Sequence, residues 1–389
     1  MIFQKNKNHL ITSESVAAGH PDKIADKISD AILDSYISAH PLSRTAIETL
    51  VTKDNVIIAG EVFGPTIQNS DIETIVRNII KDIGYKDDGF HWQKVMVSIF
   101  LHKQSSDIIL GVDRDEQGAG DQGIMYGYAS IETENLMPAP IFYAHLILKN
   151  IAHAVKIGKI PKLGPDAKSQ ITLLYENNFP ICAKSVIVSI QHPENLGQLE
   201  VKEIIYPYVV SSLPEGWMCT EKNFLVNPTG RFVIGGPIGD CGLTGRKIMV
   251  DTYGGYIPHG GGAFSGKDPT KVDRSAAYMS RYLAKNIVTA GLAERCLVQL
   301  SYAIGIAEPT SFYIDTLCTG KVKEIEIIKF IQNNIDLSIK GIIKHLSLNR
   351  PIYKATACYG HFGKEPTSMG EFSWEKTDLS KDLYDRFNK

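Results

Sequence analysis

The order helix, two strands, helix occurs three times along the chain. In the first unit, apolar positions recur every four residues from Pro21, two β-branched runs meet at Lys53-Asp54, and a second helical pattern stops at Gly84. The same order recurs over residues 139–210 and over residues 272–334. Helices can bury the apolar face of each hairpin, so the sequence predicts three similar α+β domains. The units lie more than a hundred residues apart, too far for a solenoid.

The bulk composition excludes several classes of partner. The 41 Lys and Arg residues nearly balance the 43 Asp and Glu residues, so the net charge of -2 provides no field that would collect nucleic acid or anionic membrane. The first residues lack a signal-peptide pattern, and no stretch approaches the roughly 20 apolar residues of a membrane helix. We therefore expect a cytoplasmic protein that binds neither nucleic acid nor membrane. The six cysteines contain no C-x-x-C pair, which predicts reduced, buried thiols.

Two glycine-rich segments lie outside the repeated units. One covers residues 111–127, and the other, residues 235–266, holds eleven of the 33 glycines. Such runs rarely form long helices or strands, because glycine loses the most backbone entropy on folding. The sequence therefore predicts loops built around a ligand.

The end of the second glycine-rich segment is a near miss to the P-loop pattern. Gly261, four residues, Gly266 and Lys267 are followed by Asp268, where Ser or Thr would hold magnesium, so a standard P-loop is not expected. Four cations and two acids nevertheless crowd this region: Arg246, Lys247, Lys267, Lys271, Asp240 and Asp273. This combination favours a site for polyphosphate with metal. The alternative, a charged surface loop, is weaker because two aromatic residues interrupt the segment.

Two further pairs of residues are ambiguous on spacing alone. His20 and Asp22 stand where a helix begins, which offers free N–H groups to a phosphate, and Asp22 could hold a divalent cation. An Asp in a first helical turn is more often a partner of the helix dipole, and without further context this simpler interpretation is favoured. Glu48 and Glu61 would share one face of the first hairpin, where a solvated outer face is the simpler interpretation.

Residues 118–123, GAGDQG, formally satisfy the dinucleotide fingerprint G-x-G-x-x-G. They follow a polar segment and not a buried strand, and no acidic residue stands about 20 positions later. A Rossmann oxidoreductase is therefore a distant alternative.

Longer stretches are more distinctive than these short motifs. They include TSESVAAGHPDKIADKISDAILD (12–34), GAGDQGIMYGYA (118–129), PDAKSQIT (165–172), NPTGRFVIGGPIGDCGLTGRKIMVDTYGG (227–255) and PIYKATACYGHFG (351–363). Together with residues 259–296 and 301–311, they resemble the methionine adenosyltransferase (S-adenosylmethionine synthetase) family. The resemblance extends over nearly the whole chain.

The resemblance implies three α+β domains related by pseudo-threefold symmetry, over residues 1–107, 118–233 and 234–389, with the chain interleaved between them. Residues 104–117 would form a mobile lid loop. The active site would be shared between two subunits, so we expect at least a homodimer, and a homotetramer as a dimer of dimers.

The implied reaction forms S-adenosylmethionine from L-methionine and ATP by attack of the methionine sulfur on C5′. Tripolyphosphate leaves and is hydrolysed to phosphate and diphosphate. A thioether has no proton to lose, so catalysis needs no general base but must align the sulfur and absorb charge on the triphosphate. Two alternatives remain open: a phosphoryl-transfer enzyme, and a non-catalytic homologue that binds ATP or assembles with an active subunit.

Residue roles carry over where the motifs match. ATP would contact His20, Asp166, Lys168, Arg231, Phe232, Asp240, Arg246, Lys247, Ala263 and Lys267. Methionine would contact Glu61, Gln104, Asp240 and Lys271. Two Mg²⁺ per subunit would meet Asp22 and Asp273, and one K⁺ per subunit would meet Glu48. The catalytic group would comprise His20, Lys168, Arg246 and Lys267, and Asp121 would also belong to the site.

The chain departs from the family at two places. Within the lid, Ile109 and Leu110 stand where the family has Asn and Gln, and the loop is a few residues shorter than in bacterial relatives. This difference puts lid closure and turnover in doubt, but not the reaction. The segment EPTSMGEF (365–372) before Trp374 is a small insertion that we expect to affect only the surface.

Overall fold

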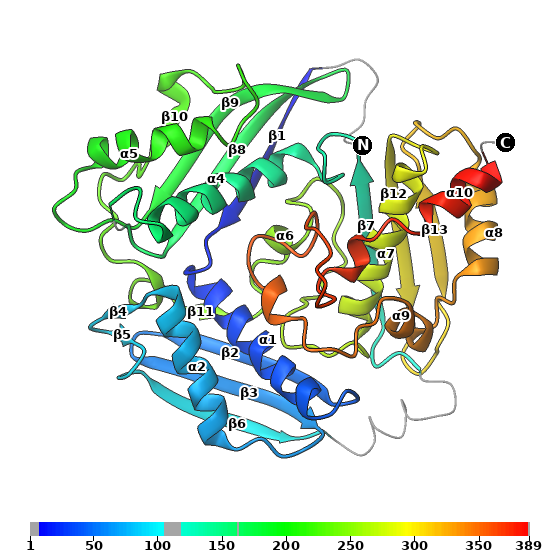
Figure 1. The fold of residues 1–389 in the computed structure, drawn as a ribbon, viewed down its shortest axis with the longest axis horizontal. Helices are drawn as coiled ribbons and strands as arrows, with labels where there is room; N and C mark the ends of the chain where they lie inside the picture. Colours follow the sequence, from blue (N-terminus) through cyan, green and yellow to red (C-terminus); the bar gives the residue numbers. More distant parts are fainter. Residues whose placement is uncertain (1–7, 105–117, 162, 388–389) are drawn as a thin grey trace.

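The computed structural model describes residues 8–104, 118–161 and 163–387. Its helices and strands form three lobes around the short helix α6 (Ile248–Asp251), as Figure 1 shows. Each lobe combines one sheet with packed helices, which confirms the predicted α+β fold of three similar domains.

The predicted order of helix, hairpin and helix is present in every lobe. The first lobe contains α1 (Pro21–Ala39), β2 (Arg44–Thr52), β3 (Asn55–Phe63) and α2 (Asn69–Ile83). The second contains α4 (Ala139–Lys156), β8 (Ala167–Glu176), β9 (Phe179–Ile190) and α5 (Gln198–Val210). The third contains α7 (Val272–Thr289), β12 (Arg295–Tyr302), β13 (Ser311–Asp315) and α8 (Glu324–Asn334).

Each sheet also takes a strand from a distant part of the chain. That strand always pairs antiparallel with the first strand of the hairpin: β11 (Gly242–Leu243) with β2, β1 (His9–Val16) with β8, and β7 (Gly123–Ser130) with β12. In two lobes the second hairpin strand gains a parallel neighbour, β6 (Met96–Lys103) beside β3 and β10 (Phe224–Val226) beside β9. This repeated pairing expresses the pseudo-threefold symmetry.

The sequence boundaries of the three domains remain a prediction. The larger sheet of each lobe includes one strand from outside the range predicted for that domain. Of the predicted lid, residues 105–117 lie outside the described residues, Ile109 and Leu110 among them. The remaining elements are β4 (Lys86–Asp87), β5 (Phe90–His91), α9 (Ile339–His345), α10 (Ser380–Phe387) and four 3₁₀ turns at Glu221–Asn223, Gly236–Ile238, Lys354–Thr356 and Ser373–Glu375.

The first hairpin has the predicted register. A two-residue turn at Lys53-Asp54 pairs Glu48 with Ala59, and Glu61 lies on the same face as Glu48. Side chains on the other face, including Ile47, Val51, Val56 and Ile58, are buried against α1 and α2. Local turn geometry is enough to set this register, because side chains alternate between the two faces of a strand.

Helix α1 contributes to two hydrophobic cores. Its apolar positions Ile24, Ile28, Ile32 and Tyr36 pack in the core of the first lobe. Leu33 and Ile37 pack in the larger core that the second and third lobes share. The helix therefore joins the first lobe to the rest of the molecule.

A second stripe on α1 is charged. It consists of Asp22, Asp26, Asp30 and Asp34, four residues apart, and is called the aspartate stripe below. Each carboxylate accepts a backbone hydrogen bond of 2.8–2.9 Å from a segment far along the chain, with donors Leu243, Gly245, Gly266 and Tyr353. The stripe therefore holds three distant segments against one helix, since Leu243 and Gly245 belong to the same one.

Asp30 makes the strongest of these connections. Arg274 of α7 donates from Nη1 to Asp30 Oδ1 at 2.7 Å and from Nη2 to Oδ2 at 3.1 Å, and both side chains are fully buried. Ser265 Oγ donates to the same carboxylate at 3.0 Å. This bidentate ion pair ties the first lobe to the third.

Two predictions from composition can be compared with the structure. All six cysteines are free, but Cys296 alone among them is buried and Cys318 is exposed, so the prediction of buried thiols is wrong for five of them. Their burial follows from tertiary position, which cysteine spacing does not encode. No helix in the described part of the chain is long and apolar enough to cross a membrane.

Asp30→Asn should destabilise the protein strongly, because it leaves the buried Arg274 guanidinium without its counter-charge. Breaking such a buried pair typically costs about 3–5 kcal/mol. Glu73→Gln is the matched control, since Glu73 pairs with Arg77 at 2.6 Å on a partly exposed helix face, where a pair contributes about 0.3–0.5 kcal/mol. Urea unfolding of both variants measures the difference. An equal decrease in the free energy of unfolding in both variants would show that the buried pair contributes little to the stability of the lobe interface.

Candidate active site

The first group of predicted site residues gathers where β1 ends and α1 begins. His20 is the N-cap of α1, and its Nδ1 accepts the backbone N–H of Asp22 at 3.2 Å. Both side chains are buried. Burial, together with nearby Lys247 and Lys168, lowers the pKa of His20 to about 3. The ring is therefore neutral near pH 7, and because Nδ1 is an acceptor, the proton lies on Nε2, which can donate.

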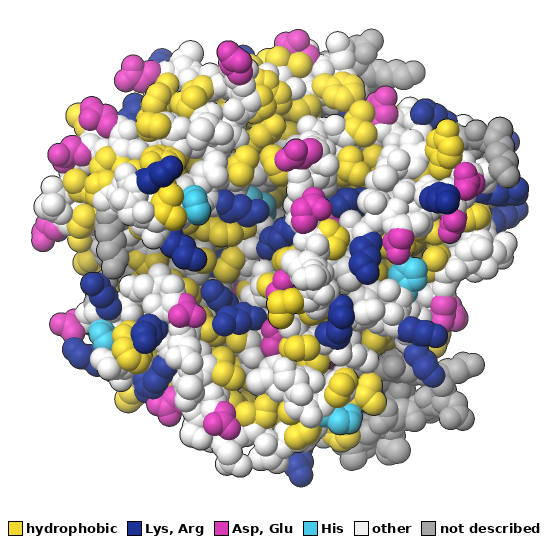
Figure 2. All heavy atoms as spheres, viewed as in Figure 1, with side chains coloured by type: hydrophobic (Ala, Val, Ile, Leu, Met, Phe, Trp, Pro, Cys, Tyr) yellow, Lys and Arg dark blue, Asp and Glu magenta, His cyan; other side chains and the backbone are white. Residues whose placement is uncertain are grey.

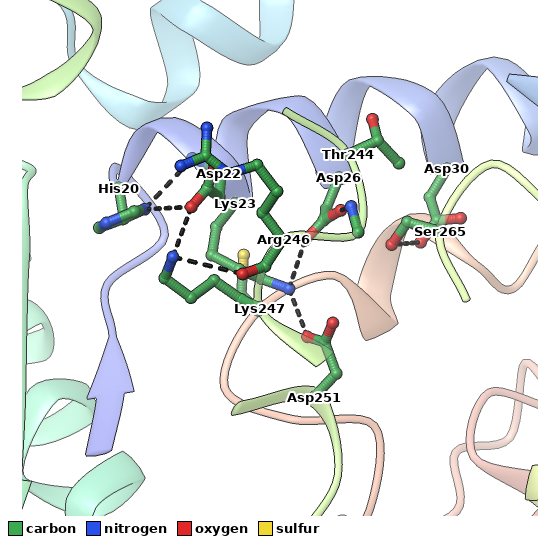
Figure 3. Close-up of polar contacts among 12 residues, drawn as sticks. His20, Asp22, Lys23, Asp26, Asp30, Thr244, Arg246, Lys247, Asp251 and Ser265 are labelled. Carbon is green, nitrogen blue, oxygen red and sulfur yellow. Dashed lines mark hydrogen bonds and ion pairs between the residues drawn. The ribbon is translucent and has the colours of Figure 1, made fainter. Parts of the chain in front are cut away.

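Two predicted cations reach this helix start from one loop, residues 244–251, called the cation loop below. Lys247 Nζ donates to Asp22 Oδ2 at 2.5 Å, and Arg246 Nε lies 3.7 Å from Asp22 Oδ1 (Figure 3). Burial would raise the pKa of Asp22, but hydrogen bonds from Lys247 and Leu243 hold it below its ordinary value. Asp22 is therefore an ionised carboxylate between two cations.

The segment before the cation loop approaches α1 very closely. A Cβ on Gly242 would lie 2.2 Å from the carbonyl group of Pro21, so only glycine fits there. This contact, with the hydrogen bond from Leu243 N to Asp22, fixes the loop against the start of the helix.

The second lobe adds residues to the same group. Strand pairing sets Val16 of β1 opposite Lys168 of β8, which brings Lys168 close enough to His20 to lower its pKa. Asp166 Oδ2 accepts the N–H of Gly236 at 2.8 Å, whereas its Oδ1 is buried without a hydrogen-bond partner among the described residues. Burial raises the pKa of Asp166 to about 6. An orphaned buried oxygen fits a ligand hydroxyl.

Three further residues that are predicted to contact ATP, Arg231, Phe232 and Asp240, lie between β10 and β11, and a fourth, Ala263, lies between α6 and α7. The backbone of Phe232 is held by His192, whose Nε2 accepts the Phe232 N–H at 3.0 Å. Arg231 and Asp240 are exposed, and Arg231 pairs with Glu194 at 2.5 Å. Ala263 lies against Gly245 of the cation loop, where a Cβ on Gly245 would come within 2.5 Å of the Ala263 Cβ.

A second group lines a cavity of about 190 Å³ between the first and third lobes. The predicted residues among its lining are Glu61, Gln104, Asp121, Lys267, Lys271 and Asp273. Gln104 Oε1 is buried and has no hydrogen-bond partner among the described residues. Lys271 Nζ donates to Asp268 at 2.6 Å, and Lys267 Nζ donates to Asp273 at 2.6 Å. The structure thus brings these side chains together from four separate segments.

Glu48 lies beside this second group. Burial raises its pKa, and the nearby charge of Lys267 opposes that change. An isolated antiparallel β-bridge holds the backbone of Lys267 against Ala46, which lies two residues before Glu48 on the same strand. The prediction places a K⁺ ion at this carboxylate.

Sequence reasoning missed two polar side chains of this lining, those of Arg44 and Thr270. Arg44 begins β2 and lies on the same face as Ala46 and Glu48, so the alternation of the strand could have indicated it. Nothing in the local sequence around Thr270 points to the cavity.

The carboxylates available for metal suit magnesium bound with phosphate. The described residues contain no cluster of three or more His, Cys, Asp or Glu that could hold a metal. Asp22 and Asp273 are instead single carboxylates, each paired with a lysine. Magnesium is commonly held by one or two carboxylates plus substrate phosphates, so this donor set fits the predicted ion.

Cations also mark the surface of this region. On the face shown in Figure 2, Lys and Arg side chains gather near the middle, where the three lobes of Figure 1 meet. A near-neutral chain can therefore still present a local anion site.

Comparisons with known proteins identify the family of the chain. Three family models match in sequence: the S-adenosylmethionine synthetase N-terminal domain over residues 8–106, its central domain over 116–232 and its C-terminal domain over 234–376. The S-adenosylmethionine synthase of Rhodospirillum centenum is 59% identical over 375 residues, covering 96% of this chain and 97% of the relative. That of Paramagnetospirillum magneticum is 58% identical over 385 residues, covering 98% and 99%. The chain therefore belongs to the S-adenosylmethionine synthetase family, whose members are methionine adenosyltransferases.

Proposed function

We propose that this chain forms S-adenosylmethionine by attack of the methionine sulfur on C5′ of ATP, in a site that two subunits share. The released tripolyphosphate is then hydrolysed to phosphate and diphosphate in the same cationic group. Formation of S-adenosylmethionine from methionine and ATP accords with the family. The observation that carries the finer proposal is the division of the predicted residues into a cationic group and a separate cavity.

The cationic group suits the departing triphosphate. Lys168, Arg246 and Lys247 surround the start of α1, and negative charge that grows on the leaving group is stabilised by fixed positive charge. His20 is neutral and carries its proton on Nε2, so it can donate a hydrogen bond to the leaving oxygen without changing its charge. No residue needs to remove a proton from methionine.

The second group suits the methionine head group. Glu61 offers a carboxylate to the ammonium, the orphaned Gln104 Oε1 offers a further acceptor, and Lys271 offers a cation to the carboxylate. Asp240, the fourth predicted methionine contact, lies instead near the first group, where its charge contributes to the raised pKa of Asp166. We infer that the cavity of one subunit faces the cationic group of another, so that one methionine meets both.

Exposed apolar residues on the three sheets support this association. They are Ile57, Met96 and Phe100 on the first sheet, Leu10 and Leu225 on the second, and Ile124 and Tyr313 on the third. Extensive exposed apolar surface commonly marks a protein interface, and a second copy of the chain would cover it. The proposed assembly is at least a homodimer, with a homotetramer as a dimer of dimers.

The proposed ions are two Mg²⁺ and one K⁺ per subunit. Asp22 and Asp273 would hold magnesium, which when bound would neutralise triphosphate charge, and Glu48 would hold potassium. In the substrate-free protein, Lys247 and Lys267 neutralise the same two aspartates. When Mg²⁺ and ATP bind, each lysine would therefore leave its aspartate and pair with a phosphate of ATP.

Product analysis tests the proposed reaction. Incubation with methionine, ATP, Mg²⁺ and K⁺ should yield S-adenosylmethionine by mass spectrometry, with phosphate and diphosphate in equal amounts. Formation of ADP would instead support a phosphoryl-transfer enzyme, and absence of any product would support a non-catalytic homologue.

Asp22→Asn should reduce turnover by about a hundredfold or more, because a neutral amide is a poor ligand for magnesium but fills the same volume. The apparent affinity for Mn²⁺, measured by electron paramagnetic resonance with tripolyphosphate present, should fall as well. Asp88→Asn, which removes an exposed pair with Lys94, is the control and should change neither value. Unchanged Mn²⁺ affinity in Asp22→Asn would remove Asp22 from the metal site.

The pKa of Asp166 predicts a pH dependence of nucleoside binding. Oδ2 already accepts from Gly236, so only the ionised carboxylate leaves Oδ1 free to accept a ligand hydroxyl. Because burial raises the pKa of Asp166 to about 6, affinity should rise with pH through about 6 and then level off. Adenosine is the suitable probe, because it has no phosphate that titrates in this range. In Asp166→Asn the dependence between pH 5 and 7 should disappear. An identical profile in parent and variant would assign the titration to another group.

A further inference from the structure

A fully buried lysine lies beneath the cationic group. Lys23 follows Asp22 in the first turn of α1, and none of its surface is exposed. Its Nζ donates to Asp26 Oδ2 at 2.7 Å and to Asp251 Oδ1 at 2.5 Å, as Figure 3 shows. Burial alone would lower the pKa of Lys23, but the carboxylates of Asp251 and Asp26 outweigh it and raise the pKa. The side chain is therefore a buried cation.

These three residues hold the cation loop at both ends. Asp26 uses its other oxygen, Oδ1, to accept the backbone N–H of Gly245 at 2.8 Å. Asp251 ends the short helix α6, which begins directly after Lys247. Arg246 and Lys247 therefore stand between two anchor points, Gly245 and Asp251, that Lys23 connects through its two carboxylate partners.

Stability alone is a poor explanation for this arrangement. Buried ion pairs cost desolvation and are often no more stabilising than apolar residues of similar volume. The loop has a specific need for anchors, because Arg246, Lys247 and nearby Lys168 carry like charges that repel one another. A loop of this kind would otherwise spread its cations away from the helix start.

We propose that Lys23, Asp26 and Asp251 are positioning residues that fix the cation loop, so that Arg246 and Lys247 face the triphosphate over the start of α1. The inference rests on the proposed function, because that function assigns the two cations to the triphosphate. Lys23 and Asp26 are fully buried and Asp251 nearly so, so their effect on a bound triphosphate would pass through the loop.

Asp26→Asn is the most informative substitution. An amide has one acceptor oxygen, so it can serve Lys23 Nζ or the Gly245 N–H but not both. Asp34→Asn is a matched control on the same helix, because Asp34 likewise accepts with both oxygens, from the N–H groups of Tyr353 at 2.9 Å and Lys354 at 2.8 Å. Those donors belong to a segment outside the candidate site.

Asp26→Asn should weaken binding of tripolyphosphate with Mg²⁺ by about tenfold in calorimetry, equivalent to the loss of one charge-assisted hydrogen bond. It should raise KM for ATP while leaving KM for methionine within about twofold, since the methionine cavity has its own contacts. Asp34→Asn should change all three values by less than about twofold. A purely structural role would lower thermal stability in both variants without this split.

Lys247→Met separates failure of this inference from failure of the proposed function. If Lys247→Met leaves tripolyphosphate affinity unchanged, the cation loop does not bind the triphosphate and that part of the proposed function is wrong. If Lys247→Met weakens the affinity but Asp26→Asn behaves like Asp34→Asn, the positioning role is overturned and the function stands. Should Asp26→Asn fail to fold, Asp251→Asn, which disturbs the other anchor, is measured in the same way and decides between these outcomes.

Discussion

The aspartate stripe of α1 is the constraint on which the rest of the structure depends. A buried carboxylate is costly unless it is paired or hydrogen-bonded, so Asp22, Asp26 and Asp30, which are buried, each require a donor, and the half-buried Asp34 has one as well. The donors are supplied by Leu243, Gly245, Gly266 and Tyr353, all more than two hundred residues further along the chain. One helix of the first lobe therefore orders the segments that carry most of the predicted phosphate contacts. Its own first turn carries His20 and Asp22, so scaffold and site share one element.

In the long segment before α7, glycine allows the backbone to approach other segments closely, and this matters more than its conformational flexibility. A Cβ on Gly242 would meet Pro21, and a Cβ on Gly266, whose φ is +81°, would lie 2.0 Å from the Ile47 carbonyl oxygen. These contacts let backbone N–H groups reach the aspartate stripe. The sequence predicts a loop around a ligand; in the structure the segment places Arg246 and Lys247 beside Asp22, but much of it is packed against protein.

Local features of the fold were predictable, and long-range pairing was not. Helix periodicity and turn residues determine α1, the hairpin register and the end of α2 at Gly84, because each depends on neighbours in sequence. The strands that complete each sheet, β1, β7 and β11, pair with partners over a hundred residues away. Their sequences indicate neither the strand nor its partner: β7 begins inside the glycine-rich segment 111–127 and β11 lies inside the segment 235–266, both of which the sequence predicts to be loops. Likewise, the pattern found the stripe from Ile24 to Tyr36 but not the aspartate stripe beside it, because charged residues on a helix usually face water.

The candidate site also depends on long-range pairing that the sequence does not specify. This pairing explains why the cations of the site do not appear in the net charge of the chain. Long motifs located the predicted ligand residues, whereas the sequence did not indicate the role of Lys23, because a lysine in a helix is rarely buried.

In the structure, Lys247 pairs with Asp22, Lys267 with Asp273 and Lys271 with Asp268. Each of these three lysines thus has an acid of its own, so the pairs contribute little to the net charge. Such pairs keep the cations ordered before substrate arrives. On the proposed function, the site selects a ligand that satisfies both members of the pairs at once, and a polyphosphate that arrives with metal ions does so.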